Sequence, residues 1–572
     1  MGEHKASKEK KPGKKLNLNQ HKKTVLGGGL VVVIAIAGII TGFFLISGED
    51  DPEVVFIWGT GGLTSIDPHT YGSRENFAIL ENIVESLFDY EFTAEGSNVV
   101  PSLALGGNWS VDKLNFTCYL RQDVKFHDGS PFNATAVKWN FDRIYILKDH
   151  LYWYYWLHPD GTPIINFTKT QVIDEYTIKF VLSKPFVPFE ALLGNNPKIV
   201  SPLSTPYDNF SRFEIDKLVG TGPFKYDSSA VRYDPDLDEY FILNTTLSRN
   251  HNYWGEGPNF DKVIIKIFEN TTLKGEALIS GDIHGAEAYP FEPSVYENAG
   301  LNLINWTTRE VNFISLNNSV VNKTMRKAIS YALDYDLLVP LGREWSTGPQ
   351  DVIRTRSRLS KGMLYSNWED FDVPTLNITK ARQVLIKANL PGTSGLTAND
   401  NVSTGNEWES LVYNGTPLAE YNFSYIVNWD FHRDMALLFQ NNLTQIGINI
   451  TVFPRTFWDH WFSVNEHQFL IYGWFPDYND PRANMGYYGD YFSNPSMVND
   501  THLQNLIENA DQEYNKTLRE QLYYEIQEYL IEDLYPEIWW YTPLNRVPFS
   551  PKVAGINMYN NWDLPFYEWY FL

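Results

Sequence analysis

Residues 101–143 read PSLALGGNWSVDKLNFTCYLRQDVKFHDGSPFNATAVKWNFDR, and this stretch decides the fold. Apolar residues alternate over 114–126 and predict a pair of strands, which the turn residues HDGSP at 127–131 close. A helical pattern follows at 133–147, and Asn133 is placed to cap its first turn. Strands followed at once by a helix are typical of an α/β domain.

The same mixture of patterns extends outward from this stretch in both directions. It predicts strands at 53–60, 171–182, 222–248 and 448–453, helices at 75–89, 323–338, 379–389, 431–446 and 501–533, and a loop at 391–417. Both halves of the chain are therefore interpreted as α/β lobes, and the second half begins near Val311. The lobes and their connections span roughly 520 residues, which predicts two or three domains because a single core rarely grows that large.

A charge-free apolar run, Val25 to Ile46, precedes the α/β region. Its 22 residues are enough to cross a hydrocarbon core of about 30 Å, whereas the apolar core of a signal peptide is usually shorter. Eight Lys precede the run and three acidic residues follow it, so the positive-inside rule places the tail in the cytoplasm. We expect a cytoplasmic tail at 1–23, a retained transmembrane anchor at 24–47 and an extracellular remainder. A cleaved signal is the disfavoured alternative, because no small-x-small cleavage pattern follows the run.

Eighteen N-x-S/T sequons follow the apolar run, beginning at Asn108 and ending at Asn515. A glycan acceptor must face solvent in a secreted protein. The sequons therefore predict an extracellular glycoprotein, in agreement with the topology expected from the charges.

The composition excludes several classes of protein. The formal net charge of −23 argues against nucleic acid and against anionic membrane surfaces as partners. Cys118 is the only cysteine, so an internal disulfide framework is excluded, and we interpret it as a small buried hydrophobe. Aromatic residues make up 15% of the chain, which fits either a large core or a ligand cleft lined with rings.

Catalytic and metal-binding signatures are missing from the sequence. It contains no HExxH, GxSxG or Walker loop, and its histidines are scattered. Composition alone leaves a glycosidase open, although no carboxylate pair stands out. The segment from Asp234 begins like a calcium loop, but the sixth position is Glu239 and the twelfth is Thr245, which favours a solvated hairpin tip. We therefore expect no metal, no cofactor and no enzymatic activity.

The opening stretch resembles the signature of the family 5 solute-binding proteins, the oligopeptide and dipeptide receptors of ABC importers. The family pattern runs P-x-L-A, W, an aromatic strand, L-R-x-x-V-x-F-x-D-G and a helix ending in R, and residues 101–143 match it throughout. Further strings agree in order: SIDPHTYGSRENFAILENIVESLFDY at 65–90, GTGPFKY at 220–226, RNHNYW at 249–254, RKAISYALDYD at 326–336, GWFPDYNDP at 473–481 and PEIWWYTPLNRVPFSPKVAG at 536–555. The resemblance covers nearly all of residues 53–572.

This resemblance implies an α/β, two-lobed, class II periplasmic-binding-protein-like fold with an extra subdomain, preceded by the one N-terminal transmembrane helix. The implied limits are 53–100, 216–310 and 545–572 for lobe I, 101–215 for the extra subdomain and 311–544 for lobe II. Lobes of such proteins close over a ligand about hinges. The sharp bend expected at Gly220–Pro223 suits a hinge.

The resemblance also implies ligand-binding residues in the GWFPDYNDP string. In peptide-binding relatives an Asp at the place of Asp477 pairs with the α-amino group of the ligand, and a carboxylate in a dry cleft suits an ammonium. The alternative is that Asp477 only caps the loop. Trp474 and Phe475 are interpreted either as cleft wall or as core.

Four further residues complete the implied site. Gly72 and Ser73 match the family's extended segment that pairs with a peptide backbone, and Tyr541 is placed to line the floor of the cleft. Arg455 falls where the family's general peptide receptor has a Trp, and two interpretations stay open for it. It either holds a ligand carboxylate or is a surface charge.

Three functions stay open at this point. The first is a monomeric receptor that captures a peptide for an ABC permease, and the second is the same fold binding an oligosaccharide. The third is an anchored hydrolase or a surface-layer protein, against which the missing catalytic motifs and missing repeats count. A glycosylated, anchored receptor without a cysteine for lipid attachment is similar to archaeal members of the family.

Overall fold

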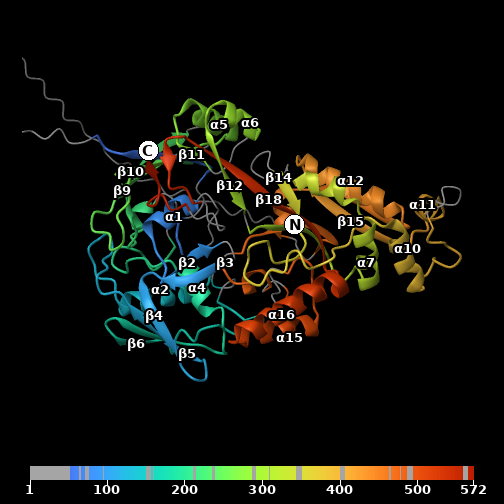
Figure 1. Cartoon of the computed structure of the whole chain (residues 1–572), viewed down its shortest axis with the longest axis horizontal. Coiled ribbons are helices and arrows are strands. Elements are labelled where there is room, and N and C mark those ends of the chain that lie inside the picture. The colour runs from blue at the N-terminus through green and yellow to red at the C-terminus, as the bar shows by residue number, and fades with distance from the viewer. Residues whose placement is uncertain are drawn as a thin grey trace, which may run out of the picture. The chain divides into compact units, whose positions relative to one another are not determined.

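One large mixed sheet connects most of the structure, a computed structural model shown in Figure 1. Its strands are β1 (Val55–Thr60), β8 (Phe224–Asp234), β9 (Glu239–Arg249), β10 (Lys262–Ile267), β11 (Gly285–Ala286), β12 (Asn302–Thr307), β13 (Val311–Leu316), β14 (Asp351–Arg354), β15 (Ala419–Ile426), β16 (Ile448–Arg455), β17 (Phe469–Trp474) and β18 (Glu537–Phe549). The order is β16-β15-β17-β13-β18-β11-β1-β10-β9-β8, and β12 and β14 pair with β18 beside it.

The structure describes residues 52–572 apart from short gaps. The gaps are 63–65, 71–75, 94–95, 150–151, 153–155, 159, 210, 212–213, 235–238, 287–290, 308, 343–350, 400–405, 463–465, 477, 486–487, 489–493 and 558–563. The tip of the hairpin formed by β8 and β9, where the calcium alternative was considered, lies outside the described residues.

Strand β18 joins the two halves of the large sheet. Its first residues, 537–541, pair with β13, and its last residues, 544–549, pair with β12. Because β12 and β13 are consecutive in the chain, two antiparallel connections run side by side between the halves. These connections are the crossings between the two halves of the sheet, whereas the proposed hinge at Gly220–Pro223 is elsewhere.

Three small sheets complete the strands. They are β4 (Ala104–Trp109), β5 (Asn115–Leu120), β7 (Thr177–Val181) and β6 (Gln171–Asp174) in that order, then β2 (Phe88–Thr93) with β3 (Gly96–Pro101), and β19 (Val553–Ala554) with β20 (Tyr570–Phe571). The strand pair predicted over 114–126 is wrong, because β5 pairs with β4 and β7 and ends at Leu120. Val124 and Phe126 are buried in a turn segment, and this burial produced the alternating pattern.

The longer helices begin mostly at polar caps. The described helices are α1 (Phe77–Ile83), α2 (Ala134–Leu147), α4 (Phe189–Asn195), α5 (Thr271–Ser280), α6 (Pro293–Asn298), α7 (Lys323–Ala332), α8 (Tyr335–Leu338), α10 (Ile378–Lys387), α11 (Asn406–Tyr413), α12 (Asp430–Thr444), α13 (Phe457–Phe462), α14 (Arg482–Met485), α15 (Thr501–Gln512) and α16 (Lys516–Glu528). Asn133 caps α2 as predicted, and its side chain accepts a hydrogen bond from Ala136 N at 2.9 Å.

Several predicted helices are shorter than expected. The segment 75–89 is helical only to Ile83, because Glu85 is extended and its buried carboxylate binds groups from another part of the chain. The side chain of Asp334 caps a new helix and divides 323–338, and Asn515 divides 501–533 in the same way. The predicted loop 391–417 contains α11, whose Trp408 is buried.

Buried side chains form four cores. The first includes Phe56, Trp58 and Trp569, the second Phe116, Phe141 and Phe189, the third Ile314, Phe423 and Trp540, and the fourth Phe313, Tyr523 and Trp539. The third and fourth cores cover opposite faces of the sheet at β13, since Phe313 and Ile314 are neighbours in that strand. The domain limits stay predictions.

The predicted anchor at 24–47 lies outside the described residues. In the part of the chain that the structure describes, no helix is both long and apolar enough to cross a membrane. Most described sequon asparagines have solvent access, but Asn317 and Asn442 are buried and their side chains are hydrogen-bonded inside the protein. These two are therefore unsuitable for a glycan.

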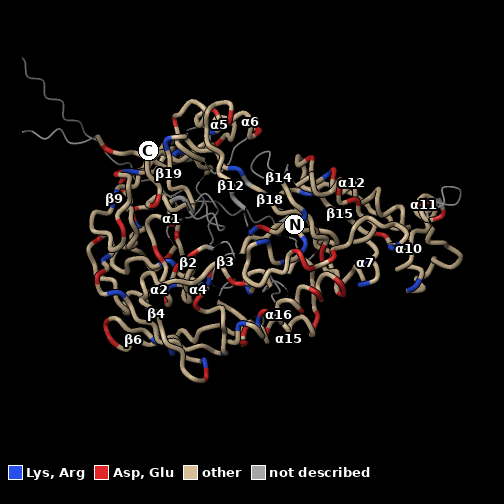
Figure 2. The backbone as a smooth tube through the Cα atoms, viewed as in Figure 1, with Lys and Arg blue, Asp and Glu red and all other residues tan. Residues whose placement is uncertain are grey.

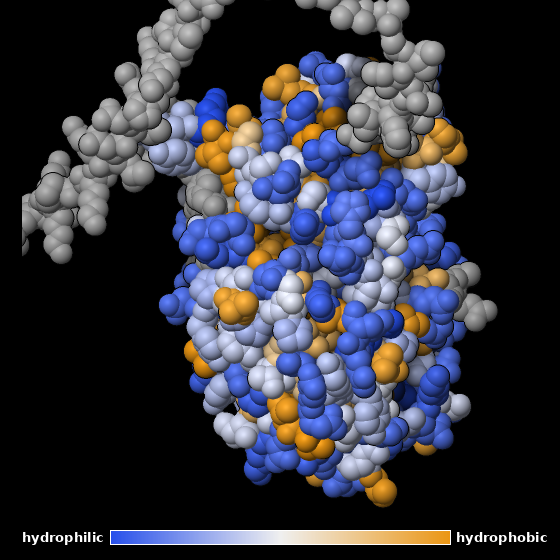
Figure 3. All heavy atoms as spheres, turned by 90° about the vertical axis from the view of Figure 1, so that its left-hand side faces the viewer, coloured by the Kyte–Doolittle hydropathy of each residue, from blue (hydrophilic) through white to orange (hydrophobic). Residues whose placement is uncertain are grey.

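The surface is polar and carries both signs of charge. Figure 2 shows acidic and basic residues interspersed along the described chain. The face in Figure 3 is mostly hydrophilic, with hydrophobic residues scattered over it. Isolated apolar residues are normal on a solvated surface.

Candidate functional site

Residues 474–485, which we call the junction loop, lie where three cores meet. Trp474 packs against the fourth core, and Phe475 packs against the first. Tyr478 and Ala483 belong to the second core, although they follow β17 in the sequence. A segment with contacts to three separate cores lies where different parts of the described chain meet, and binding sites preferentially lie at such places.

Two buried ion pairs fix the junction loop to the helices that follow it. Both nitrogens of the Arg519 guanidinium fork lie 2.8 Å from the oxygens of Asp480, and Arg482 Nε lies 2.8 Å from Asp511 Oδ2. All four side chains are at most 8% exposed. Burial raises the pKa of Asp511 to about 6, and the Arg482 charge opposes this shift. The loop is therefore held by charge-assisted bonds in a dry environment, which are stronger than neutral ones.

The junction loop also contacts β2 and α4. The backbone N–H of Asn479 donates to Tyr90 Oη over 3.2 Å, and Tyr90 Oη in turn donates to the carbonyl of Ala191. Burial raises the pKa of Tyr90 well above its usual value, so this hydroxyl stays protonated. The loop is thus bonded on one side to β2 and on the other to α16.

A second cluster joins three of the signature strings around Glu85. Its carboxylate accepts hydrogen bonds from Thr221 Oγ1 at 2.6 Å, Tyr253 Oη at 2.8 Å and Trp254 Nε1 at 2.9 Å. Burial raises the pKa of Glu85, and the three hydrogen bonds oppose this effect. Residues of the strings at 65–90, 220–226 and 249–254 therefore meet in this hydrogen-bonded cluster, and the cluster has a structural role.

Close packing explains the glycines that were interpreted as a hinge. A Cβ on Gly220 would lie 2.0 Å from the carbonyl oxygen of Ile83, and one on Gly222 would lie 2.8 Å from the carbonyl oxygen of Asn82. The backbone approaches α1 too closely for any side chain. Packing thus accounts for these glycines, and the hinge role of the segment stays a prediction.

The site residues predicted from the sequence are only partly described. Asp477, Gly72 and Ser73 lie outside the described residues, so their roles stay predictions. Trp474 ends β17, and its indole N–H donates to Ala483 O over 3.1 Å, which shapes the junction loop. Phe475 is half-buried in the same loop.

Tyr541 and Arg455 lie outside the junction loop but on strands near its start, since Asn312 of β13 pairs with Gly473 on one side and with Tyr541 on the other. Tyr541 is completely buried in β18, and its ring packs against Trp540 at 4.6 Å between centroids. Arg455 ends β16 and lies 3.5 Å from Glu466. Strands β16 and β17 both run parallel to β15, so Arg455 and Trp474 share the carboxyl edge of this part of the sheet. That edge is where ligands of open α/β sheets bind.

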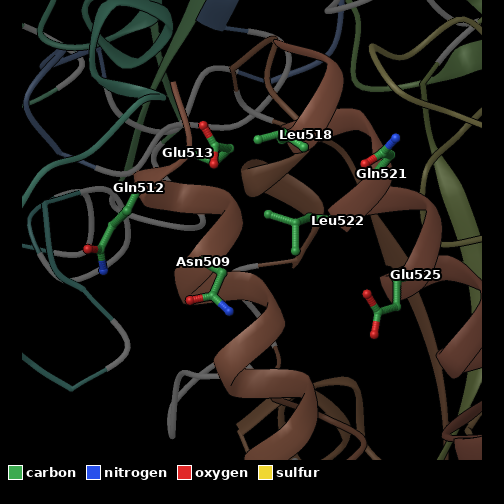
Figure 4. Close-up of a pocket in the computed structure, with 7 residues that line it drawn as sticks. All are labelled: Asn509, Gln512, Glu513, Leu518, Gln521, Leu522 and Glu525. Atoms are coloured by element: carbon green, nitrogen blue, oxygen red, sulfur yellow. The ribbon is translucent and has the colours of Figure 1, made fainter. Parts of the chain in front are cut away.

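A surface groove lies between α15 and α16 and is shown in Figure 4. It has a volume of about 510 Å³ and is lined by Asn509, Gln512, Glu513, Leu518, Gln521, Leu522 and Glu525. These residues are on other faces of the two helices than Asp511 and Arg519, which bind the junction loop. The groove contains no ring or cation to recognise a ligand, so the junction loop is the better candidate site.

Sequence reasoning missed the residues that hold the loop. Asp480 and Asn479 stand inside the quoted GWFPDYNDP string, but their partners Arg519 and Tyr90 are far away in the chain.

Among the described residues, no group of three His, Cys, Asp or Glu side chains is arranged to hold a metal ion.

A sequence profile identifies the family. The profile of the bacterial extracellular solute-binding proteins, family 5 (middle region), matches residues 98–495. The chain belongs to this family. The range matched in this family 5 protein contains the opening stretch and the whole junction loop.

Two curated relatives extend the comparison. A probable D,D-dipeptide-binding periplasmic protein of Escherichia coli is 23% identical over 498 residues, which cover 82% of this chain and 84% of that protein. A glutathione-binding protein of Pectobacterium atrosepticum is 26% identical over 467 residues, covering 80% and 83% respectively. Both are named as binding proteins and not as enzymes.

Solved structures share the fold of this family 5 protein. The ABC transporter-associated periplasmic binding protein of Helicobacter pylori, in complex with the peptide STSA, has a TM-score of 0.69 at 21% identity and covers 91% of this chain and 98% of its own. A dipeptide-binding protein of a Pseudoalteromonas species, in complex with Met-Leu, has a TM-score of 0.68 at 18% identity, covering 91% and 100%. A Brucella suis protein in complex with Fe(III)-EDTA scores 0.69 at 20% identity, covering 90% and 100%. The fold alone therefore leaves the ligand open.

Proposed function

We propose that this protein is a membrane-anchored extracellular receptor that captures short peptides for an ABC importer. The observation that carries the proposal is the junction loop, which joins three cores and is fixed by two buried ion pairs. The described residues that follow Asp477 are held by these ion pairs, and we propose Asp477 itself as the residue that binds the ligand. A site on rigid elements loses less entropy when a ligand binds.

The relatives support a peptide as the ligand. The relatives named above bind, by their names, D,D-dipeptides and glutathione, and two structures of the same fold contain bound peptides. All of these ligands carry an α-amino group, which Asp477 is suited to bind as a charged pair.

The proposed location rests on the sequence. The apolar run Val25–Ile46, the eight Lys before it and the sequons after it support a single-pass protein whose binding region is outside the cell. Protease added to intact cells should remove the binding region and spare the Lys-rich tail. A mature N-terminus near Gly48 would instead show that the run is a cleaved signal.

Mass spectrometry of small molecules that co-purify with the full-length protein tests the proposed ligand class. We expect short peptides, and calorimetry with a pool of di- to hexapeptides should then give binding. Recovery of an oligosaccharide and no response to peptides would replace the peptide proposal with the sugar alternative. The structure weakens one argument for sugar, because Trp58, Trp156, Trp408, Trp540 and Trp569 are fully buried in cores.

A further inference from the structure

The side-chain amide of Asn479 is buried without a hydrogen-bond partner. Its side chain is 3% exposed, and within the described chain neither its Oδ1 nor its Nδ2 has a partner. An amide deprived of both water and a partner destabilises the protein that carries it. A buried unsatisfied group of this kind in a native protein needs a functional explanation.

The neighbours of Asn479 define where its amide lies. Tyr478 is part of the second core, Asp480 binds Arg519 beside the fourth core, and Phe475 packs against the first core. The backbone N–H of Asn479 bonds to Tyr90. Asn479 therefore lies between loop residues that pack into different cores, and within the described chain no polar group satisfies its side chain.

The loop holds this amide in a fixed position. The bonds of Asp480 to Arg519 and of Arg482 to Asp511 fix the backbone on the C-terminal side of Asn479. A small number of precisely placed polar groups is what orients a ligand in its site. An amide offers both an acceptor and two donors, which matches the C=O and N–H groups of a peptide main chain.

From this geometry, and resting on the peptide-binding function proposed above, we infer that Asn479 hydrogen-bonds the main chain of the bound peptide. It is a specificity-determining residue two positions from the predicted α-amino contact, Asp477. A ligand without amide groups in this place leaves Asn479 unsatisfied and binds more weakly.

The test is Asn479→Leu in the full-length protein purified in detergent, with Asn140→Leu as the matched control. Asn140 is also buried, but its side chain is bonded to Ala136 O, Val200 O and Val200 N. For each protein we would measure the thermal midpoint without peptide and the Kd for a pool of di- to hexapeptides. We expect Asn479→Leu to keep or raise the midpoint and to weaken binding at least tenfold, whereas Asn140→Leu lowers the midpoint.

Two results would overturn the inference while leaving peptide binding intact. One is peptide binding by Asn479→Leu as tight as that of the wild type. The other is a fall in the midpoint as large as that of Asn140→Leu, which would make Asn479 a structural residue. A wild-type protein that binds no member of the pool would overturn the proposed function and this inference together.

Discussion

Two buried Arg–Asp pairs hold two different signature strings of this chain. Arg143 and Asp67 join the end of the opening stretch to the string at 65–90, and Arg519 and Asp480 join α16 to the junction loop. All four side chains are at most 5% exposed. The two pairs look alike in burial and chemistry, so their surroundings must distinguish what they do.

The guanidinium group of Arg143 is surrounded by hydrogen-bond partners. Besides Asp67, its guanidinium donates to the carbonyls of Pro206 and Asp208 at 2.9 Å and contacts His69 Nδ1 at 2.9 Å. Next to Asp480, by contrast, stands the unpaired amide of Asn479. We therefore expect the Asp67 pair to act on stability and the Asp480 pair to act on ligand binding through the position of Asn479.

The largest effect is expected from Asp67→Asn, which leaves the Arg143 charge buried without its counter-charge. Breaking such a pair costs about 3–5 kcal/mol of stability. Asp123→Asn removes the exposed Asp of an Arg–Asp pair and should change stability by less than about 1 kcal/mol. Urea unfolding of both variants measures the difference. Equal small effects would show that the Asp67 pair is not structural.

Asp477→Asn is the next largest change and acts on binding. Loss of the buried partner of an α-amino group should weaken peptide binding by about 2–5 kcal/mol. The fold should survive, because the residue is predicted to face the ligand. Calorimetry on proteins of equal thermal stability, with Asp112→Asn as an exposed control, checks this. Unchanged peptide affinity would show that Asp477 does not bind the ligand.

Burial of His69 should make the folded protein less stable at acid pH. Burial and the Arg143 charge lower the pKa of His69 to about 4, whereas the unfolded chain titrates near 6.5. Below pH 6.5 the unfolded state therefore binds the extra proton, and stability is lost as the pH falls towards 4, by about 2 kcal/mol at pH 5. His69→Gln can keep the bonds to Arg143 and Lys198 O without titrating.

Unfolding of wild type and His69→Gln at pH 7 and pH 5 tests this expectation. The variant should lose less stability than the wild type between the two pH values. Equal losses of stability would mean that the pKa of His69 is not lowered in the folded protein.

The smallest effect is expected from replacing both members of one pair. Asp480→Asn with Arg519→Met removes both buried charges, a change that is often close to neutral for stability. Peptide affinity should nevertheless fall about tenfold, or about 1.4 kcal/mol, because the loop is no longer fixed. The double change Asp67→Asn with Arg143→Met should leave affinity unchanged. A tenfold loss of peptide affinity in both double variants would show that the two ion pairs do not differ in their effect on binding.

Local chemistry made part of the fold predictable. The Asn133 cap and the hairpin over 222–248 were found because each depends on residues close in sequence. Glu85 was assigned to a helix because the apolar residues around it keep a helical spacing. Its burial beside Thr221, Tyr253 and Trp254 is a tertiary effect that no local pattern reports.

The candidate site was predictable only as a string of residues. The quoted motif contains Asn479 and Asp480, but nothing in it indicates that Arg519 pairs with Asp480 across 39 positions. Asp334 and Asn515 gave a usable signal, since both are good N-cap residues inside segments predicted as single helices. The apolar periodicity hid these breaks because it continues across them.

The place of β18 near the end of the chain has a consequence for how the protein is made. Residues 537–549 supply pairing partners to both halves of the large sheet, and Phe566 and Trp569 complete the first core around Phe56 and Trp58. Synthesis proceeds from the N-terminus, so neither half of the large sheet is complete before β18 has been made. The sheet β4-β5-β7-β6 does not use β18, but the large sheet is expected to form only after β18 emerges. A chain truncated before β18 is expected to be a substrate for quality control and not a half-working receptor.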